Sequence, residues 1–322
     1  MSVNVFGKYE YVYAVYTEKS FTRAAKKLFI SQPSLSAAIK NIENQVGAPL
    51  FERNGGKVTL TQIGTEYISA AEKIMRAESD FFNRIHDIYN LEAGKLTVGG
   101  SNYLSSSALP RIINTFSSRY PNIEVSLVEA NSTTLGNMVQ NEEIDIVIDS
   151  FDETMDIYEG YPLHNERILL CVPREWEINK KLMKYQISPE NVYRGQVDME
   201  NIPSVNLSAF AQESFVILKK GNDMHNRAMS IFENEGISPH VAFSVDQLNI
   251  SYALAESGMG ACFVTDTLFK LGRGSENVVL YNVEQKYGSR TLYIAFKKNR
   301  YCTNAMKKFI DTAKEVLIKN VL

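Results

Sequence analysis

The sequence is poor in cysteine, tryptophan and histidine, and it contains no long uninterrupted apolar run. Its 322 residues include three cysteines, one tryptophan and four histidines. The cysteines Cys171, Cys262 and Cys302 lie far apart in the chain, which suits a reducing compartment better than a disulfide framework. The histidines lack the mutual spacing of a metal site, and no stretch has the character of a membrane span or a signal peptide. We therefore expect a cytoplasmic protein without a metal, a cofactor or a membrane contact.

The signatures of common enzyme chemistry are missing as well. The glycines within 98–101 and 257–261 do not complete a dinucleotide fingerprint, and no serine stands in a nucleophile elbow. We expect no catalytic site and no enzyme. A chain of 322 residues is long for one compact domain, so two or three domains are expected.

The net charge of −3 is spread unevenly along the chain. Residues 1–64 hold eight Lys and Arg against four Asp and Glu, a net of +4, so the remaining chain carries −7. A basic head on an acidic body is the asymmetry expected when only the head meets phosphate.

Three stretches of this head repeat apolar residues at helical spacing. The three sets are Tyr9, Val12, Tyr13 and Tyr16, then Phe21, Ala24, Ala25 and Leu28, and finally Leu35, Ile39, Ile42 and Val46. Ser20 and Ser31 stand at helix N-cap positions, Pro33 suits a first turn, and Gly47 ends the third helix. Two helices joined by the break at 29–31 describe a helix-turn-helix.

Burial of the third apolar set turns a polar face of that helix outward, and small polar side chains allow a helix to enter the major groove closely. The helix N-terminus itself favours phosphate. The candidate DNA contacts on this helix are Ser31, Gln32, Pro33, Ser34, Ser36 and Lys40. The alternative is an ordinary solvated helix face.

Two features that follow favour the DNA interpretation. Two β-like runs surround residues 54–56, a hairpin signal, and Arg53 and Lys57 flank its tip, where a wing would reach phosphate or the minor groove. From Thr61 onward, residues recur at alternating spacings of four and three, which is typical of a coiled-coil seam. The seam comprises Tyr67, Ala70, Ile74, Ala77, Phe81, Arg84 and Ile88. A dimer through 62–90 would read two half-sites of a roughly palindromic operator, whereas the alternative is a long helix packed on its own domain.

The run SFTRAAKKLFISQPSLSAAIKNIENQVGAPLFER (20–53), with VTLTQIG (58–64), resembles the winged helix-turn-helix of the LysR-type transcriptional regulators. The sequence departs from the family pattern in three places. Ala37-Ala38 stands where the family often has a basic residue, Ile42-Glu43 replaces a Leu-Glu pair, and Lys57 replaces a wing arginine without its planar fork.

Beyond Gly94, strand-like and helix-like segments alternate, which predicts an α/β fold with parallel strands and with ligands at the carboxyl ends of those strands. The family likeness implies two lobes joined by crossing strands, similar to periplasmic binding proteins. We expect a DNA-binding domain at 1–61, a linker helix at 62–92 and an effector domain at 93–322. Its first lobe would comprise about 93–170 and 267–322, and its second about 171–266.

The same likeness places a small-molecule effector between the lobes. Its candidate contacts are Ser101, Asn102, Ser132, Thr133, Phe215 and Gln247. Hydroxyls and amides at helix N-termini suit a small organic anion or a polar carbonyl compound, although plain N-capping would explain them equally well. The segment 174–213 exceeds the family pattern and could be a flap over the cleft, a contact between protomers or a tolerated surface insertion.

These features predict a DNA-binding transcriptional regulator controlled by an effector. The resemblance implies assembly into dimers and tetramers, and RNA polymerase is a further candidate partner. The alternatives are a redox-sensing regulator that uses Cys171 and Cys262, an enzyme with a DNA-binding head, and a nonspecific architectural DNA binder.

Overall fold

A computed structural model describes residues 5–54, 57–88, 93–150, 155–199, 201–272, 274–284, 286 and 288–321. The side chains of 53, 54, 57, 88, 155 and 318–321 lie outside this description. The chain divides into two compact units, residues 1–82 and residues 83–322. Within the described residues, no helix combines the length and apolar character that a membrane span requires.

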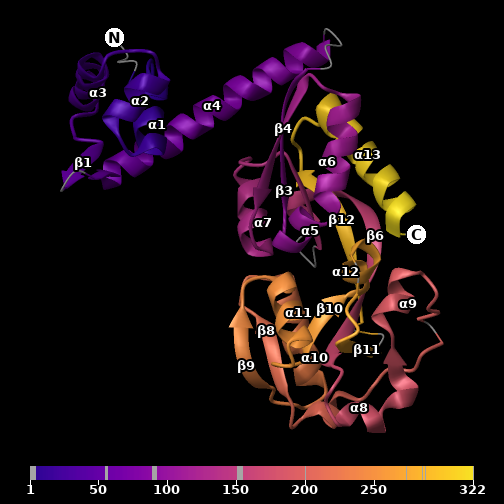
Figure 1. Cartoon of the computed structure of the whole chain (residues 1–322). Coiled ribbons are helices and arrows are strands. Elements are labelled where there is room, and N and C mark those ends of the chain that lie inside the picture. The colour runs from indigo at the N-terminus through magenta and orange to yellow at the C-terminus, as the bar shows by residue number, and fades with distance from the viewer. Residues whose placement is uncertain are drawn as a thin grey trace. The chain divides into compact units, whose positions relative to one another are not determined.

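The first unit contains the predicted winged helix-turn-helix (Figure 1). Its elements are α1 (Tyr9–Glu18), α2 (Phe21–Lys27), α3 (Gln32–Val46), β1 (Phe51–Asn54), β2 (Lys57–Leu60) and the start of α4 (Gln62–Ile88), which continues into the second unit. The apolar faces of α1, α2 and α3 form one core. Ser20 caps α2, Ser31 caps α3 and Gly47 ends α3 with a φ of +84°. The expected helices and hairpin are confirmed.

Three polar or small residues fix the wing and α4 to this core. Glu43 Oε1 accepts from the backbone N–H of Leu50 at 2.7 Å, and the Thr61 hydroxyl donates to Pro49 O at 2.7 Å while accepting from Gly64 N at 2.9 Å. Gly64 lies so close to the Leu50 carbonyl that an added Cβ would stand 2.0 Å from its oxygen. The glycine is therefore a steric requirement at this junction.

The predicted coiled-coil seam is wrong at its first residue. Tyr67 is buried in the core of its own unit, where its hydroxyl donates to Val5 O at 2.9 Å and its ring stacks on Phe6 at 4.8 Å. Further along α4, Ala77 and Phe81 are exposed. The spacing of apolar residues is real, but the intramolecular core takes the first turns of the helix.

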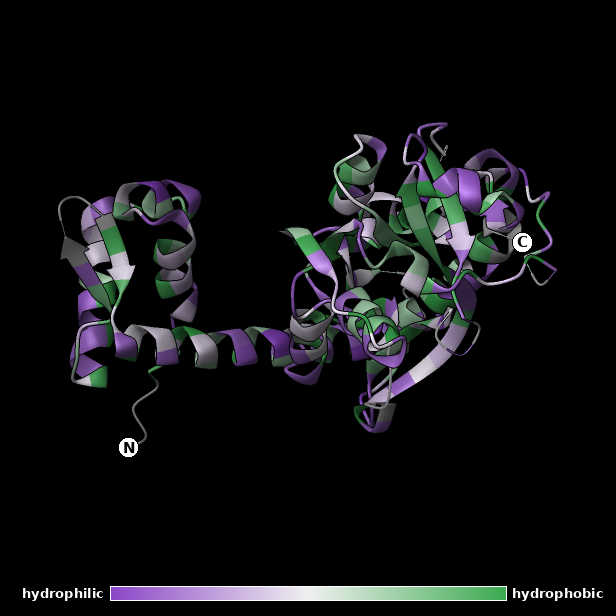
Figure 2. Ribbon diagram, turned by 90° about the horizontal axis from the view of Figure 1, so that it is seen from below, coloured by the Kyte–Doolittle hydropathy of each residue, from purple (hydrophilic) through white to green (hydrophobic). Residues whose placement is uncertain are grey.

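The second unit is an α/β structure with the parallel strands expected at its start. Its elements are β3 (Gly94–Gly100), α5 (Asn102–Ser106), α6 (Ala108–Arg119), β4 (Ile123–Glu129), α7 (Ser132–Gln140), β5 (Ile146–Ser150), η1 (Met155–Ile157), β6 (Tyr158–Pro173), α8 (Ile178–Lys181), η2 (Met183–Tyr185), β7 (Gln186–Ile187), α9 (Pro189–Tyr193), η3 (Leu207–Phe210), β8 (Ser214–Leu218), α10 (Asp223–Asn234), β9 (His240–Val245), α11 (Leu248–Glu256), β10 (Cys262–Thr265), α12 (Asp266–Leu271), β11 (Val278–Asn282), β12 (Ser289–Lys297) and α13 (Asn304–Val321). Apolar residues concentrate on the strands inside this unit (Figure 2).

One long strand, β6, joins two lobes of this unit (Figure 1). Its first part, 158–167, pairs with β12, and its second part, 168–173, pairs with β10 and β11. In the first lobe β3 runs parallel to both β4 and β5, while β8 and β9 form a separate parallel pair in the second lobe. The sequence placed all of 267–322 in the first lobe. Strand β11 instead hydrogen-bonds to the second-lobe part of β6, and the chain returns to the first lobe only at β12.

The 174–213 segment packs onto the second lobe. Its strand β7 extends the sheet beyond β11, and Ile187 and Val192 join the apolar core there. Buried Asn179 accepts from the Tyr281 hydroxyl at 2.6 Å and donates to Pro173 O at 2.8 Å. None of its described residues lines the cleft between the lobes.

Candidate nucleic-acid interface and ligand cleft

Helix α3 presents a polar face with one positive charge. Its N-terminal residues 31–34 are exposed, Ser36 is half-buried and Lys40 is exposed. The acidic residue of α3, Glu43, turns to the wing backbone, so its charge does not oppose Lys40 on the outward face. This arrangement suits contact with a polyanion.

Hydrogen bonds hold the start of α3 in place. Ser31 Oγ accepts from Ser34 N at 3.2 Å and lies 2.7 Å from Ser34 Oγ, so Ser31 is a helix cap as expected. Gln32 Nε2 donates to Ser36 Oγ at 2.9 Å. The amide of Gln32 is therefore pre-oriented along the outward face, which lowers the entropic cost of using it in recognition.

The wing pairs Arg53 with Val58 and Asn54 with Lys57, which confirms the hairpin. The side chains of Arg53 and Lys57 lie outside the described residues.

The break before α3 contains Phe29, which the sequence patterns did not single out as a candidate contact residue. This ring is 96% exposed and its backbone has a φ of +55°, unusual for an aromatic residue. Its exposure could have been predicted, because this aromatic residue lies between two helices and belongs to the apolar face of neither.

A small cleft lies between the lobes, where the predicted parallel strands end. Four of the six candidate effector contacts line it: Ser101, Asn102, Ser132 and Gln247. The other lining residues are Tyr103, Asp149, Leu218, Asn222, Asp223, Met224, Asp246, Leu248 and Arg290. The volume that remains in this conformation is about 40 Å³.

Two candidates lie elsewhere. Phe215 is buried in the second-lobe core, where its ring packs edge-on against Phe232 at 4.8 Å, and it does not line the cleft. Thr133 contacts the opposite lobe, because its backbone N–H and its hydroxyl both donate to Gly221 O, at 3.1 and 3.2 Å.

Helix capping does not account for the serine and glutamine at the cleft. Ser101 and Gln247 occupy the N-cap positions of α5 and α11, yet neither side chain makes a capping hydrogen bond. In α7 the cap is Asn131, whose Oδ1 accepts from Thr134 N at 2.9 Å. The polar groups of Ser101 and Gln247 are thus not committed to their helices.

A buried ionic cluster forms one wall of the cleft. Arg290 Nε donates to Glu166 at 2.6 Å and Nη1 donates to Asp223 at 2.8 Å, while Arg227 Nε also donates to Asp223. Burial opposes the charge on Arg290, but Glu166 and Asp223 raise the pKa of its guanidinium above the usual value. Each of these two guanidiniums is therefore already matched by a carboxylate.

Asp149, at the carboxyl end of β5, differs from these acids. Its side chain is buried, Oδ1 accepts from Ser150 N at 2.9 Å, and Oδ2 has no hydrogen-bond partner among the described residues. Burial raises the pKa of Asp149 to about 6, although Arg290 and the Ser132 hydroxyl lower it. The Tyr103 hydroxyl, on the same cleft, is also buried and makes no hydrogen bond of good geometry in the described structure, although the Thr265 and Ser107 hydroxyls are near enough to lower its pKa.

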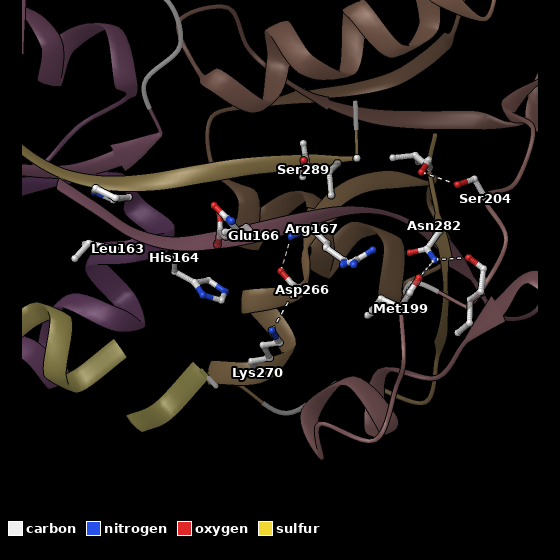
Figure 3. A pocket seen from close by; sticks show the side chains of 16 residues that line it. Leu163, His164, Glu166, Arg167, Met199, Ser204, Asp266, Lys270, Asn282 and Ser289 are labelled. Carbon is white, nitrogen blue, oxygen red and sulfur yellow. Dashed lines mark hydrogen bonds and ion pairs between the residues drawn. The ribbon is translucent and has the colours of Figure 1, made fainter. Parts of the chain in front are cut away.

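A larger cavity of about 770 Å³ lies along β6, and it is lined by Glu166, the partner of Arg290, but by none of the residues that line the cleft (Figure 3). Its polar groups are mostly engaged in internal bonds: Asn282 donates to Met199 O at 2.9 Å, Ser204 to Val283 O at 2.9 Å, and Asp266 accepts from Arg167 N at 2.8 Å. The first two bonds attach Met199 and Ser204 to the end of β11, and the third attaches α12 to β6.

The structure brings together two cysteines that are distant in the sequence. Cys171 and Cys262 are register partners in the antiparallel pair β6–β10, and both are fully buried. Burial raises the pKa of the Cys171 thiol well above its usual value, and Cys262 raises it further. No cluster of metal-binding side chains occurs in the described residues.

Comparison with known proteins agrees with this architecture. A family model described as the LysR substrate binding domain matches residues 90–318, and one described as a bacterial regulatory helix-turn-helix protein of the lysR family matches residues 6–65. The uncharacterized HTH-type transcriptional regulator YcgK of Bacillus subtilis (strain 168) is 30% identical over 311 residues, which cover 96% of this chain and 93% of that protein. A probable RuBisCO transcriptional regulator of Phaeodactylum tricornutum is 26% identical over 308 residues, which cover 94% of each chain.

Solved structures share the fold. Full-length CbnR complexed with its target DNA has a TM-score of 0.69 at 18% identity, covering 97% of this chain and 99% of that one. The effector binding domain of QuiR in complex with shikimate has a TM-score of 0.55 at 19% identity, covering 71% of this chain and all of that one (100%).

Proposed function

Because the chain belongs to the LysR family of transcriptional regulators, we propose that the outward face of α3 reads DNA and that the cleft between the lobes binds the effector. The observation that carries the first part is the outward face of α3, where Gln32 and Ser36 are hydrogen-bonded to each other and where exposed Lys40 supplies a positive charge. Ser31 caps the helix, and Gln32, Pro33, Ser34 and Ser36 would contact base edges and phosphates.

Lys40 would meet phosphate from the same face, so its removal tests this assignment. A binding sequence is first selected from a random DNA pool, and its affinity for the full-length protein is then measured against salt concentration. Lys40→Ala should weaken binding to all sequences and reduce the slope of log affinity against log salt by about 0.9, the value for one lost phosphate contact. Lys181→Ala, an exposed lysine on the second unit, is the matched control. Equal slopes for Lys40→Ala and wild type would remove Lys40 from the interface.

LysR regulators form oligomers, and we propose that the exposed part of α4 contributes one contact. Ala77 and Phe81 are exposed, and Phe81 packs edge-on against Phe82 at 5.7 Å. In the second unit the strand β9 leaves Val241 and Phe243 exposed. A second copy of the chain would cover these apolar groups.

Effector control would act through the contacts that join the lobes. Thr133 donates to Gly221 O, Asn249 Nδ2 donates to Ser106 Oγ at 2.9 Å, and Arg227 Nη2 donates to Ser150 Oγ at 3.3 Å. A ligand that binds one arrangement of the lobes better than another shifts the population toward it. In an oligomer this shift would change the spacing of the DNA-binding units and the bending of the DNA.

Redox sensing is the second candidate, because Cys171 and Cys262 are register partners. The thiolate is the reactive form, and burial disfavours the Cys171 thiolate, so we rank this function below effector binding. We further propose that the cleft binds its ligand without converting it, and that the protein works in the cytoplasm, where bacterial DNA is found.

A further inference from the structure

The charges that line the cleft are mostly negative. Among its described lining residues, Asp149, Asp223 and Asp246 are acidic and Arg290 is the single basic residue. Arg290 is already shared between Glu166 and Asp223. An added anion would therefore meet a guanidinium that is already paired and carboxylates that repel it.

Two of the three cleft aspartates have a hydrogen-bonded cation. Asp223 accepts from Arg290 and Arg227, and Asp246, at the exposed rim, accepts from Lys219 Nζ at 2.7 Å. Asp149 makes no salt bridge among the described residues and its Oδ2 accepts no hydrogen bond there, although the Arg290 charge and the Ser132 hydroxyl are near enough to lower its pKa. It is the carboxylate with capacity left for a ligand.

Buried polar atoms in folded proteins are nearly always hydrogen-bonded, so exceptions call for an explanation. Here two exceptions, Asp149 Oδ2 and Tyr103 Oη, line the same cleft. Asp149 comes from the end of β5 and Tyr103 from the first turns of α5, so both belong to the first lobe. A donor that enters the cleft can bond Asp149 Oδ2, and the Tyr103 oxygen offers a second acceptor on the lining of that cleft.

We propose that the effector presents a positively charged nitrogen, an ammonium or guanidinium group, to Asp149 in the cleft. This inference rests on the proposed function and narrows it, since hydroxyls and helix N-termini alone suggested an organic anion. The bond is charge-assisted and desolvated, which makes it stronger than a neutral hydrogen bond.

The size of the cleft limits what enters in this conformation. About 40 Å³ is available, and a cavity of about 10–15 Å³ by the same measure already holds a water molecule. The space accommodates a small cationic head group. The rest of a larger effector would extend between the lobes, which must part to admit it.

The test follows the unfolding midpoint of the full-length protein near neutral pH. The cationic probes are methylammonium, methylguanidinium, putrescine and L-arginine, and the anionic probes are acetate, succinate and benzoate. A ligand that binds only the folded state raises the midpoint in a concentration-dependent way. We expect at least one cationic probe to do so and none of the anionic probes.

Two variants assign the effect to the cleft. Asp149→Asn keeps an acceptor for Ser150 N but removes the charge, and it should lower the affinity for the active cationic probe by about 10- to 100-fold. Tyr103→Phe should lower the same affinity by about 2- to 10-fold. Asp311→Asn, an exposed carboxylate on α13, is the matched control and should bind as wild type does.

Three results would overturn the inference. The first is an unfolding midpoint that no cationic probe raises, and the second is a midpoint that the anionic probes raise instead. The third is equal affinity of the cationic probe for wild type and Asp149→Asn. DNA binding, measured on the selected sequence, separates these results from a failure of the proposed function. A wild-type protein that binds this DNA specifically but ignores cations contradicts only the ligand class, whereas one that does not bind DNA contradicts the regulator assignment.

Discussion

At the junction between the wing and α4, replacing Gly64 with alanine should destabilise the protein, whereas glycine-to-alanine changes in helices usually stabilise it. Gly64 lies in the first turn of α4, and a Cβ there would stand 2.0 Å from Leu50 O and 3.0 Å from the Leu50 carbonyl carbon. The Leu50 peptide is held from both sides, since Thr61 N donates to its oxygen at 3.0 Å and Glu43 accepts from its N–H at 2.7 Å. The carbonyl therefore cannot turn away without breaking other bonds.

Gly64→Ala should destabilise the first unit, although glycine-to-alanine changes inside helices normally stabilise by about 0.5–1 kcal/mol. Overpacking of a core typically costs about 1–3 kcal/mol, and a clash with fixed backbone belongs at the upper end. After the helix gain is subtracted, we expect a net loss of about 2 kcal/mol. For a unit of this size that corresponds to a fall of about 8–16 °C in its unfolding midpoint.

The single tryptophan allows the two units to be followed separately. Trp176 belongs to the second unit, so its fluorescence reports that unit alone, while far-ultraviolet circular dichroism reports the helices of both. In the variant the dichroism should show a transition at lower temperature and specific DNA binding should weaken, while the tryptophan transition stays in place.

Gly47→Ala is the control within the same unit. Its φ is +84° and a Cβ would meet nothing within 4 Å, so only the left-handed backbone is penalised, by about 1–2 kcal/mol. If Gly64→Ala were as stable as wild type, or if Gly47→Ala were the more damaging of the two, the steric explanation of the junction would be refuted.

Two further predictions concern the second unit. Asp149 faces Arg290, Asp223 and Ser132, and with its pKa raised to about 6 it becomes protonated in the free cleft as the pH falls through that value. The affinity for a cationic probe should then drop by about tenfold per pH unit below about 6, as measured by titration calorimetry, and a flat profile would exclude Asp149 as its partner. A thiol reagent should label Cys171 and Cys262 only after unfolding, because both are fully buried. Rapid labelling of Cys171 or Cys262 in the native protein, or loss of DNA binding with peroxide, would support redox sensing instead.

The head could be predicted almost completely from the sequence because its signals are local. Apolar spacing, two serine caps and a terminal glycine define α2 and α3 without reference to distant residues. Tyr67 shows where this reasoning ends. The seam spacing identifies an apolar face of α4, but spacing cannot tell whether that face is covered by a second copy or by Val5 and Phe6 of the same chain.

The cleft was only partly predictable. The rule that ligands gather at the carboxyl ends of parallel strands selected Ser101 and Ser132, which line it. The same rule applies to β5, whose sequence Ile-Val-Ile-Asp-Ser places Asp149 at the equivalent end, so this residue could have been found. Arg290 could not, because its position depends on the antiparallel pairing of β12 with a strand more than a hundred residues earlier.

The charge of the ligand also bears on how the lobes respond to it. Asp223 belongs to the second lobe and raises the pKa of Asp149 in the first, so closure brings two carboxylates toward each other. The Arg290 guanidinium offsets part of this repulsion but is shared with Glu166 as well. A cation on Asp149 removes the remaining repulsion only when the lobes are closed, so it binds the closed form more tightly than the open one. Such a difference in affinity is what a ligand needs to shift a conformational equilibrium, whereas an anion at this position would favour the open form.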